Sequence, residues 1–212
     1  MIDVAMGTVF ARRIAAAALI LTLAVLSALT AHKTHKPFSP FAPDFRTQGP
    51  ADAKVLMVEF SDFECPACRY AEKPLHDLLA LYKGHIRFVF KHYPLRMHER
   101  ARPAAIAAEC AGRQGRFWEY HDRLYDRQEE WTNDKAEMML AGYASDLKLD
   151  MDAWQACRRD PALPALLEAE LRDGNNAWVG STPTFFINGK RFVGFQQLRE
   201  RGTLFVEKEL KR

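Results

Sequence analysis

Apolar and polar positions follow two different periods along the chain. Residues 55–60 and 86–90 are short apolar runs rich in strand-forming side chains. Between them, apolar residues recur at helical spacing and predict a helix from about Pro66 to Tyr82, with Pro66 in its first turn. A strand, a helix and a second strand in this order predict a parallel strand pair and an α/β architecture.

The second half of the chain is mostly helical in pattern. Residues 184–187 and 191–193 change to a strand pattern around Asn188-Gly189, which is a strong hairpin signal, and a last helix is expected over about 196–211. Before this hairpin, apolar residues at spacings of three and four predict helices near 101–112, 116–128, 134–146, 151–159 and 163–178. A long run of helices is therefore expected to separate the two groups of strands.

The N-terminal pattern is that of an export signal. Two arginines precede the uncharged run 14–31, and basic residues follow it. The run has 18 residues, the short limit for crossing a bilayer, and it lacks a good small-x-small cleavage site. Residues 1–36 are therefore expected to be either a cleaved signal peptide or a membrane anchor through 14–31. The proline-rich segment 37–53 predicts a linker, and 54–212 the folded domain.

Charge excludes a nucleic-acid partner for the folded part. The chain has a formal net charge of +3, which comes from its first 36 residues. The rest has 26 basic and 26 acidic side chains, and so lacks the basic excess that phosphate binding needs.

Two of the four cysteines form a Cys-x-x-Cys pair at the start of the first predicted helix. Free N–H groups and the helix dipole at this position favour a thiolate on Cys65, whereas Cys68 lies one turn further on. Cys65 is expected to exchange disulfides with client proteins and Cys68 to resolve the mixed disulfide. The alternatives are a purely structural bridge or half of a zinc site, for which no second Cys-x-x-Cys is present.

Glu59 lies six residues before Cys65 on the preceding predicted strand. A buried carboxylate there would have a raised pKa and could relay protons to and from Cys68. The alternative is that Glu59 faces a sheet edge and is solvated.

Two segments of the chain resemble the two signatures of the DsbA-like thioredoxin family: VEFSDFECPAC at 58–68 and GSTPTFFING at 180–189. The resemblance spans about residues 53–211. It implies a thioredoxin-like fold with a helical insertion at about 96–178, and a protein thiol–disulfide oxidoreductase that needs no bound cofactor.

The resemblance also implies roles for individual residues. Pro183 is expected to be a cis-proline against the Cys65–Cys68 disulfide, with Thr182 offering its backbone to a client peptide. Pro66 and Ala67 are expected to contact the client as well.

The remaining cysteines, Cys110 and Cys157, both fall in the predicted helical insertion. A structural disulfide between them is expected, as in some relatives. The alternative is two separate buried thiols that act as small apolar residues.

By the same resemblance, the partners are exported client proteins and a DsbB-type membrane protein that reoxidises the chain. The protein is expected to be periplasmic or otherwise extracytoplasmic, either soluble after signal cleavage or anchored to the inner membrane. It is expected to be monomeric because 37–53 is too short for a dimerisation region. Pro-Ala between the cysteines, where strongly oxidising members have Pro-His, predicts a milder oxidant. A reductase or isomerase kept reduced by a membrane donor remains an alternative, as does a module that binds a soft metal such as Cu(I).

Overall fold

The computed structural model describes residues 19, 20, 22 and 38–212. The chain divides into two units, 1–36 and 37–212, and the second is described below. The expected signal peptide or anchor lies outside the described residues apart from those three positions. No helix among the described residues is long and apolar enough to cross a membrane.

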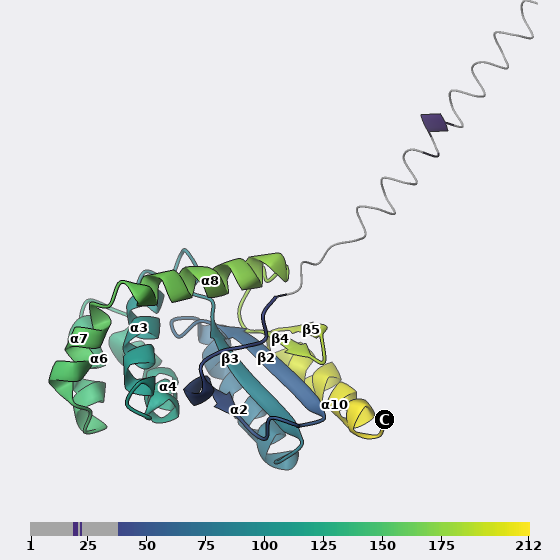
Figure 1. Ribbon diagram of the computed structural model, residues 1–212, viewed down its shortest axis with the longest axis horizontal. Coiled ribbons are helices and arrows are strands. Elements are labelled where there is room, and N and C mark those ends of the chain that lie inside the picture. Colours follow the sequence, from purple (N-terminus) through teal and green to yellow (C-terminus); the bar gives the residue numbers. More distant parts are fainter. Residues whose placement is uncertain (1–18, 21, 23–37) are drawn as a thin grey trace, which may run out of the picture. The chain divides into compact units, whose positions relative to one another are not determined.

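One mixed sheet organises the folded unit (Figure 1). Its spatial order is β1-β3-β2-β4-β5, with β2 parallel to β3 and every other neighbouring pair antiparallel. The strands are β1 (Thr47–Gln48), β2 (Val55–Ser61), β3 (Ile86–His92), β4 (Thr184–Ile187) and β5 (Lys190–Val193). The predicted parallel pair is confirmed, since Val55 is in register with Ile86 and Ser61 with His92.

The apolar runs form the central strands because both faces of the sheet are covered. Met57 and Phe88 contribute to a core on one face, whereas Val58 and Phe60 contribute to a second core on the other. A strand that is buried on both sides needs a nearly continuous apolar sequence rather than an alternating one. Glu59 shares a face with Met57, because side chains alternate along a strand.

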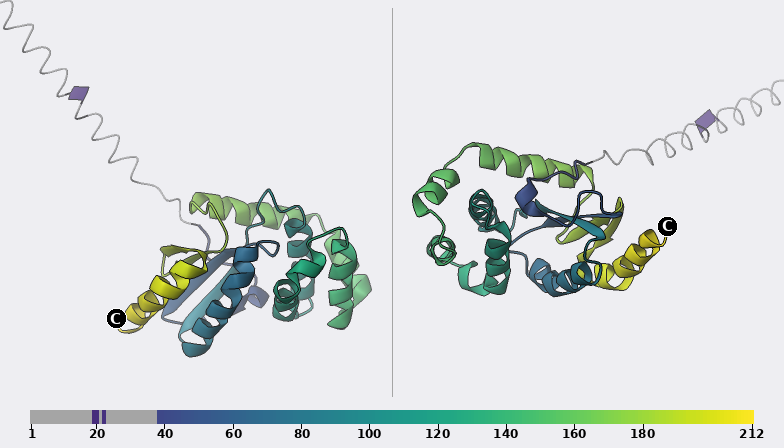
Figure 2. Two further views of the ribbon diagram at one scale, coloured as in Figure 1. Left: turned by 180° about the vertical axis from the view of Figure 1, so that it is seen from behind. Right: turned by 60° about the horizontal axis from the view of Figure 1, so that its bottom comes forward.

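Helices lie on both sides of the sheet (Figures 1 and 2). Helix α2 (Pro66–Leu81) packs on the face of Met57 together with the C-terminal segment, which consists of α9 (Gly194–Gln197), a π-helical turn (Leu198–Gly202) and α10 (Thr203–Leu210). The end of α8 (Ala162–Asn176) lies on the opposite face, where Leu171 packs against the second core. The inserted helices are α3 (Ala101–Gly112), α4 (Phe117–Asp126), α5 (Gln128–Trp131), α6 (Ala136–Asp146), α7 (Met151–Arg158) and α8 (Ala162–Asn176).

The insertion shares one core with the thioredoxin-like part. Phe63 stacks on Phe90 with ring centroids 5.4 Å apart, and Tyr125 from α4 lies 5.1 Å from Phe63. Within the insertion, Cys110 on α3 and Cys157 on α7 are joined by a disulfide. The expected architecture, a thioredoxin-like α/β fold with inserted helices, is confirmed.

The segment 37–53, which was expected to be a linker, is largely folded onto the domain over its described residues 38–53. Residues 44–46 form a short 3-10 helix, and β1 then pairs with the edge of β3. Arg46 is fully buried, with its Nη2 2.6 Å from Glu170 Oε1 and its Nε 2.8 Å from Glu109 Oε1. Much of 38–53 is therefore part of the domain, because a buried guanidinium and a strand pairing attach it there.

Candidate active site

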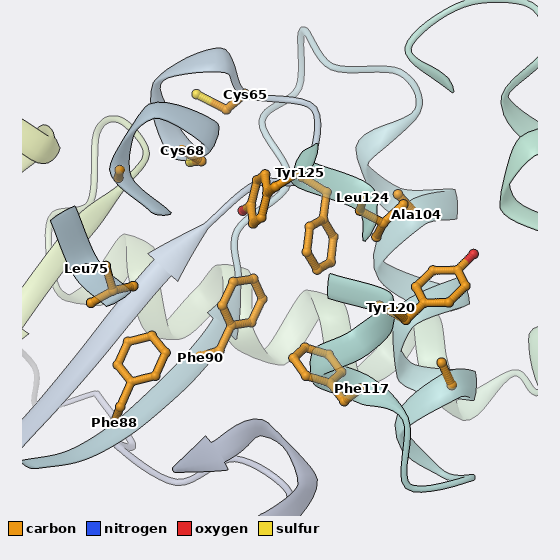
Figure 3. Close-up of a cluster of buried hydrophobic side chains, with 14 of the residues drawn as sticks. Cys65, Cys68, Leu75, Phe88, Phe90, Ala104, Phe117, Tyr120, Leu124 and Tyr125 are labelled. Carbon is orange, nitrogen blue, oxygen red and sulfur yellow. The ribbon is translucent and has the colours of Figure 1, made fainter. Parts of the chain in front are cut away.

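Cys65 and Cys68 lie at the N-terminus of α2, directly after the central strand (Figure 3). Cys65 is the N-cap residue and Pro66 occupies the first helical turn, where its missing N–H removes no helical hydrogen bond. Cys65 is 7% exposed, whereas Cys68 is fully buried one turn further along. Both are free thiols in the structure, and only Cys65 has contact with solvent.

The surroundings of Cys65 favour its thiolate. Its pKa is lowered to about 6, mainly by a hydrogen bond from the Cys68 thiol and further by Thr182 and by the backbone N–H groups of Cys68 and Ala67. Burial opposes these effects without cancelling them. Cys65 can therefore be a nucleophile, and a good leaving group, near neutral pH.

Cys68 is shifted in the opposite direction. Burial is the largest cause that raises the pKa of Cys68, followed by the hydrogen bond and the charge of Cys65 and then by the charge of Glu59. The two sulfurs thus differ both in exposure and in acidity, which is the asymmetry that a nucleophilic and a resolving cysteine require.

The loop before β4 lies against Cys65, although 117 residues separate the two in sequence. The Thr182–Pro183 peptide bond is cis, and the Cys65 thiol donates a hydrogen bond to the Thr182 carbonyl at 3.6 Å. The structure therefore brings together Cys65, Cys68, Thr182 and Pro183.

Glu59 belongs to the same site. Its side chain is fully buried on the central strand, so the alternative of a solvated sheet edge is wrong. Ser61 Oγ donates to Glu59 Oε1 at 2.8 Å, and the Tyr125 hydroxyl lies 3.0 Å from Ser61 Oγ. Burial raises the pKa of Glu59 to about 7, against the lowering effect of the Ser61 hydrogen bond. A group with this pKa can take up and release a proton at neutral pH.

The inserted helices supply two polar groups that the sequence analysis did not identify. Gln128 Nε2 donates to the Phe63 carbonyl at 2.8 Å and to the Cys65 carbonyl at 3.0 Å, so it holds the turn that leads into α2. Tyr125 lies between the inserted helices and the helix that carries Cys68 (Figure 3). No local sequence pattern predicts either role, because both depend on how α4 and α5 pack against the site.

Asp62 is a third residue that was missed, although it lies inside the first signature. Its Oδ1 accepts from Glu64 N at 2.8 Å, and its Oδ2 accepts from Leu95 N at 2.7 Å and lies 2.7 Å from His98 Nδ1. Asp62 therefore fixes the loop between β2 and the redox pair.

The zinc half-site gains no support in the part of the chain that the structure describes. Among those residues, Cys65 and Cys68 do not belong to any cluster of three or more metal-ligating side chains. A tetrahedral zinc site would need two further ligands beside the sulfurs.

Comparison with known proteins agrees with this geometry. A family model described as "Thioredoxin" matches residues 42–203. The chain is also 40% identical, over 148 residues, to a protein named Na(+)/H(+) antiporter NhaA 1 from Salinispora arenicola. That match covers 69% of this chain but only 22% of the antiporter, so the chain spans about a fifth of the length of such relatives. The antiporter's activity is therefore not attributed to this chain.

Solved structures give the fold. α-DsbA1 from Wolbachia pipientis superimposes with a TM-score of 0.69 at 20% identity, covering 81% of this chain and 93% of that one. Oxidised BdbD from Bacillus subtilis superimposes with a TM-score of 0.67 at 22% identity, covering 83% and 98% of the two chains. At these identities the likeness establishes the architecture.

Proposed function

Since the chain belongs to the thioredoxin family, we propose that it is a DsbA-like protein thiol–disulfide oxidoreductase that introduces disulfides into exported proteins. The observation that carries this proposal is the asymmetry of the Cys65–Cys68 pair at the N-terminus of α2. Cys65 is 7% exposed with a pKa lowered to about 6, and Cys68 is fully buried with a raised pKa.

The reaction starts from the Cys65–Cys68 disulfide. A client thiolate attacks Cys65 Sγ, the Cys65–Cys68 bond breaks, and a mixed disulfide between client and Cys65 forms while Cys68 leaves as a thiolate and takes up a proton. A second client thiolate then attacks the client sulfur of the mixed disulfide. The client disulfide forms and Cys65 leaves as a thiolate, so two electrons have passed from the client to the chain.

Glu59 serves the proton transfer at Cys68. With a pKa of about 7 it can hold the proton that Cys68 takes up when it leaves and accept it again when Cys68 attacks. Ser61 fixes the carboxylate by a hydrogen bond, and Tyr125 in turn holds the Ser61 hydroxyl, so both are positioning residues for this step.

The client contacts lie around Cys65. The backbone of Thr182, next to cis-Pro183, pairs with an extended client segment, while Pro66 and Ala67 border the same sulfur. The export pattern of residues 14–31 assigns the protein to the periplasm, either after signal cleavage or on an anchor. A DsbB-type membrane protein reoxidises it, and the chain acts as a monomer.

Stoichiometric oxidation of a client tests this function. The oxidised full chain, mixed with a reduced unfolded protein that has two cysteines, is expected to transfer one disulfide per chain. The Cys65→Ser variant should transfer none, and Cys68→Ala should accumulate the mixed disulfide when the reduced variant meets an oxidised client. Mass spectrometry under acid quench measures each product. Transfer by Cys65→Ser at the wild-type rate would contradict the assignment.

A further inference from the structure

A second cluster of titratable side chains lies one helical turn beyond Cys68, between α2 and α4. Glu72 Oε2 is 3.6 Å from His76 Nε2 on the same helix and 3.9 Å from His121 Nε2 on α4. Glu72, His121 and Asp122 each offer a ligand atom, and these three atoms lie within 4.8 Å of one another. Glu72, His76 and Asp122 also line a surface pocket of about 520 Å³, through which an ion can enter.

The atoms that face one another in this cluster are buried without hydrogen-bond partners. Both carboxylate oxygens of Glu72 and Nε2 of His121 make no hydrogen bond to any described residue. The His121 side chain is only 1% exposed. Buried polar atoms in native proteins are almost always satisfied by protein, water or an ion, so this arrangement points to a bound species between Glu72 and His121.

The two nearby basic side chains on α2, Arg69 and Lys73, are paired with other carboxylates. Arg69 pairs with Glu129 at 2.7 Å, and Lys73 pairs with Asp77 at 3.0 Å. Burial, followed by the charges of Glu59, Asp122 and Asp126, raises the pKa of Glu72 well above its ordinary value. A buried carboxylate among other carboxylates favours a cation as the bound species.

We propose that Glu72, His76 and His121 bind one Zn²⁺ ion. Two imidazole nitrogens and one carboxylate oxygen are a zinc ligand set, with a water in the fourth position. Metal–ligand distances of about 2.1 Å place tetrahedral ligand atoms about 3.4 Å apart. Glu72 Oε2 lies 3.6 Å from His76 Nε2 and 3.9 Å from His121 Nε2, so both separations exceed that spacing by only a few tenths of an ångström. Small rotations of the Glu72 carboxylate and of the half-exposed His76 side chain would bring the three ligand atoms around one ion.

Asp122 completes the site from outside the coordination sphere. Its Oδ1 lies 2.9 Å from Nδ1 of His121. A hydrogen bond from Nδ1 to this carboxylate keeps the proton on that nitrogen and leaves Nε2 free to bind the metal, which is the usual partnership of a zinc-bound histidine.

Zinc binding to the oxidised protein tests the proposal independently of the redox function. The full chain is purified without a polyhistidine tag and oxidised, so that Cys65 and Cys68 form a disulfide and cannot bind the metal. Titration with Zn²⁺ against a chromogenic chelator should then give one bound ion per chain. Absence of binding to the oxidised wild type would overturn the proposal.

Variants locate the site. Glu72→Gln, His76→Asn and His121→Asn should each weaken Zn²⁺ binding at least about tenfold, and Asp122→Asn about tenfold. His85→Asn, at an exposed histidine outside the cluster, should bind as the wild type does. Since His76 is 54% exposed, its replacement leaves the core intact and is the decisive change if His121→Asn fails to fold. Unchanged affinity in both His76→Asn and Glu72→Gln would overturn the assignment.

Discussion

At the scale of single residues, the acidity of Cys65 depends first on its partner sulfur. The Cys68 thiol donates the hydrogen bond that contributes most to the lowered pKa of Cys65. In the reduced wild type, thiolate absorbance should therefore appear with a midpoint at about pH 6. Cys68→Ala removes the donor and should raise this midpoint, whereas Cys68→Ser keeps a hydroxyl donor and should raise it less. Equal midpoints in the wild type and Cys68→Ala would contradict this explanation.

Glu59 gives a second prediction at this scale, on stability. Its pKa is about 7 in the folded protein and about 4.5 in the unfolded chain, so the native state keeps a proton that the unfolded state releases between these values. The contribution of Glu59 to the free energy of unfolding of the reduced wild type should therefore fall as pH rises from about 4.5 to about 7. Relative to Glu59→Gln, the fall should be about 3 kcal/mol at most.

Denaturant unfolding at several pH values measures this difference. Glu119→Gln, at an exposed carboxylate on α4, is the matched control and should keep the wild-type pH dependence. A wild-type curve parallel to that of Glu59→Gln would show that the carboxyl group titrates normally.

The sequence identified some site residues and missed others for a physical reason. Cys65 and Cys68 are recognisable because their chemistry depends on a helix N-terminus, which local spacing predicts. Tyr125 and Gln128 reach the same site through tertiary packing of the insertion, for which a single sequence has no periodic signal. The sequence leaves two roles open for Glu59, a buried proton relay or a solvated edge residue. The position of β2 at the centre of the sheet decides between them, because it buries Glu59.

At the scale of elements, periodicity predicted most helices and strands to within one or two residues. The expected last helix is divided by a π-helical turn, and the helix expected over 116–128 ends at Asp126 before the separate α5. The largest difference is the segment before β2. A 3-10 helix of three residues and a strand of two residues are too short to show a period, so this segment was interpreted as a linker. The feature that attaches it is the buried Arg46, and an arginine in a proline-rich stretch is ordinarily taken as exposed.

Arg46 therefore gives a prediction about this attachment. Arg46→Ala leaves the buried carboxylates of Glu109 and Glu170 without their guanidinium partner, and should lower the free energy of unfolding by about 3–5 kcal/mol. Arg116→Ala removes a surface ion pair with Glu119 and should change it by less than about 1 kcal/mol. Denaturant titration compares the two, and equal effects would mean that the segment is not held by Arg46.

At the scale of the whole molecule, the redox site is assembled from three parts of the chain. The thioredoxin-like strand and helix supply the cysteines and Glu59, the insertion supplies Tyr125 and Gln128, and the segment before β4 supplies Thr182 and Pro183. The order of these parts along the chain was predictable from the two signatures. The contact between Cys65 and Thr182 could be expected only from the family resemblance. Residues that are 117 positions apart give no local sequence signal that they touch.

The reduction potential of the Cys65–Cys68 pair tests the oxidase assignment most directly. A thiolate held at a low pKa stabilises the reduced form, so the disulfide should be readily reduced by clients. Equilibration with glutathione buffers, followed by thiol trapping, should give a value near or above about −150 mV. A value below about −230 mV would contradict the account and indicate a reductase or isomerase supplied with electrons.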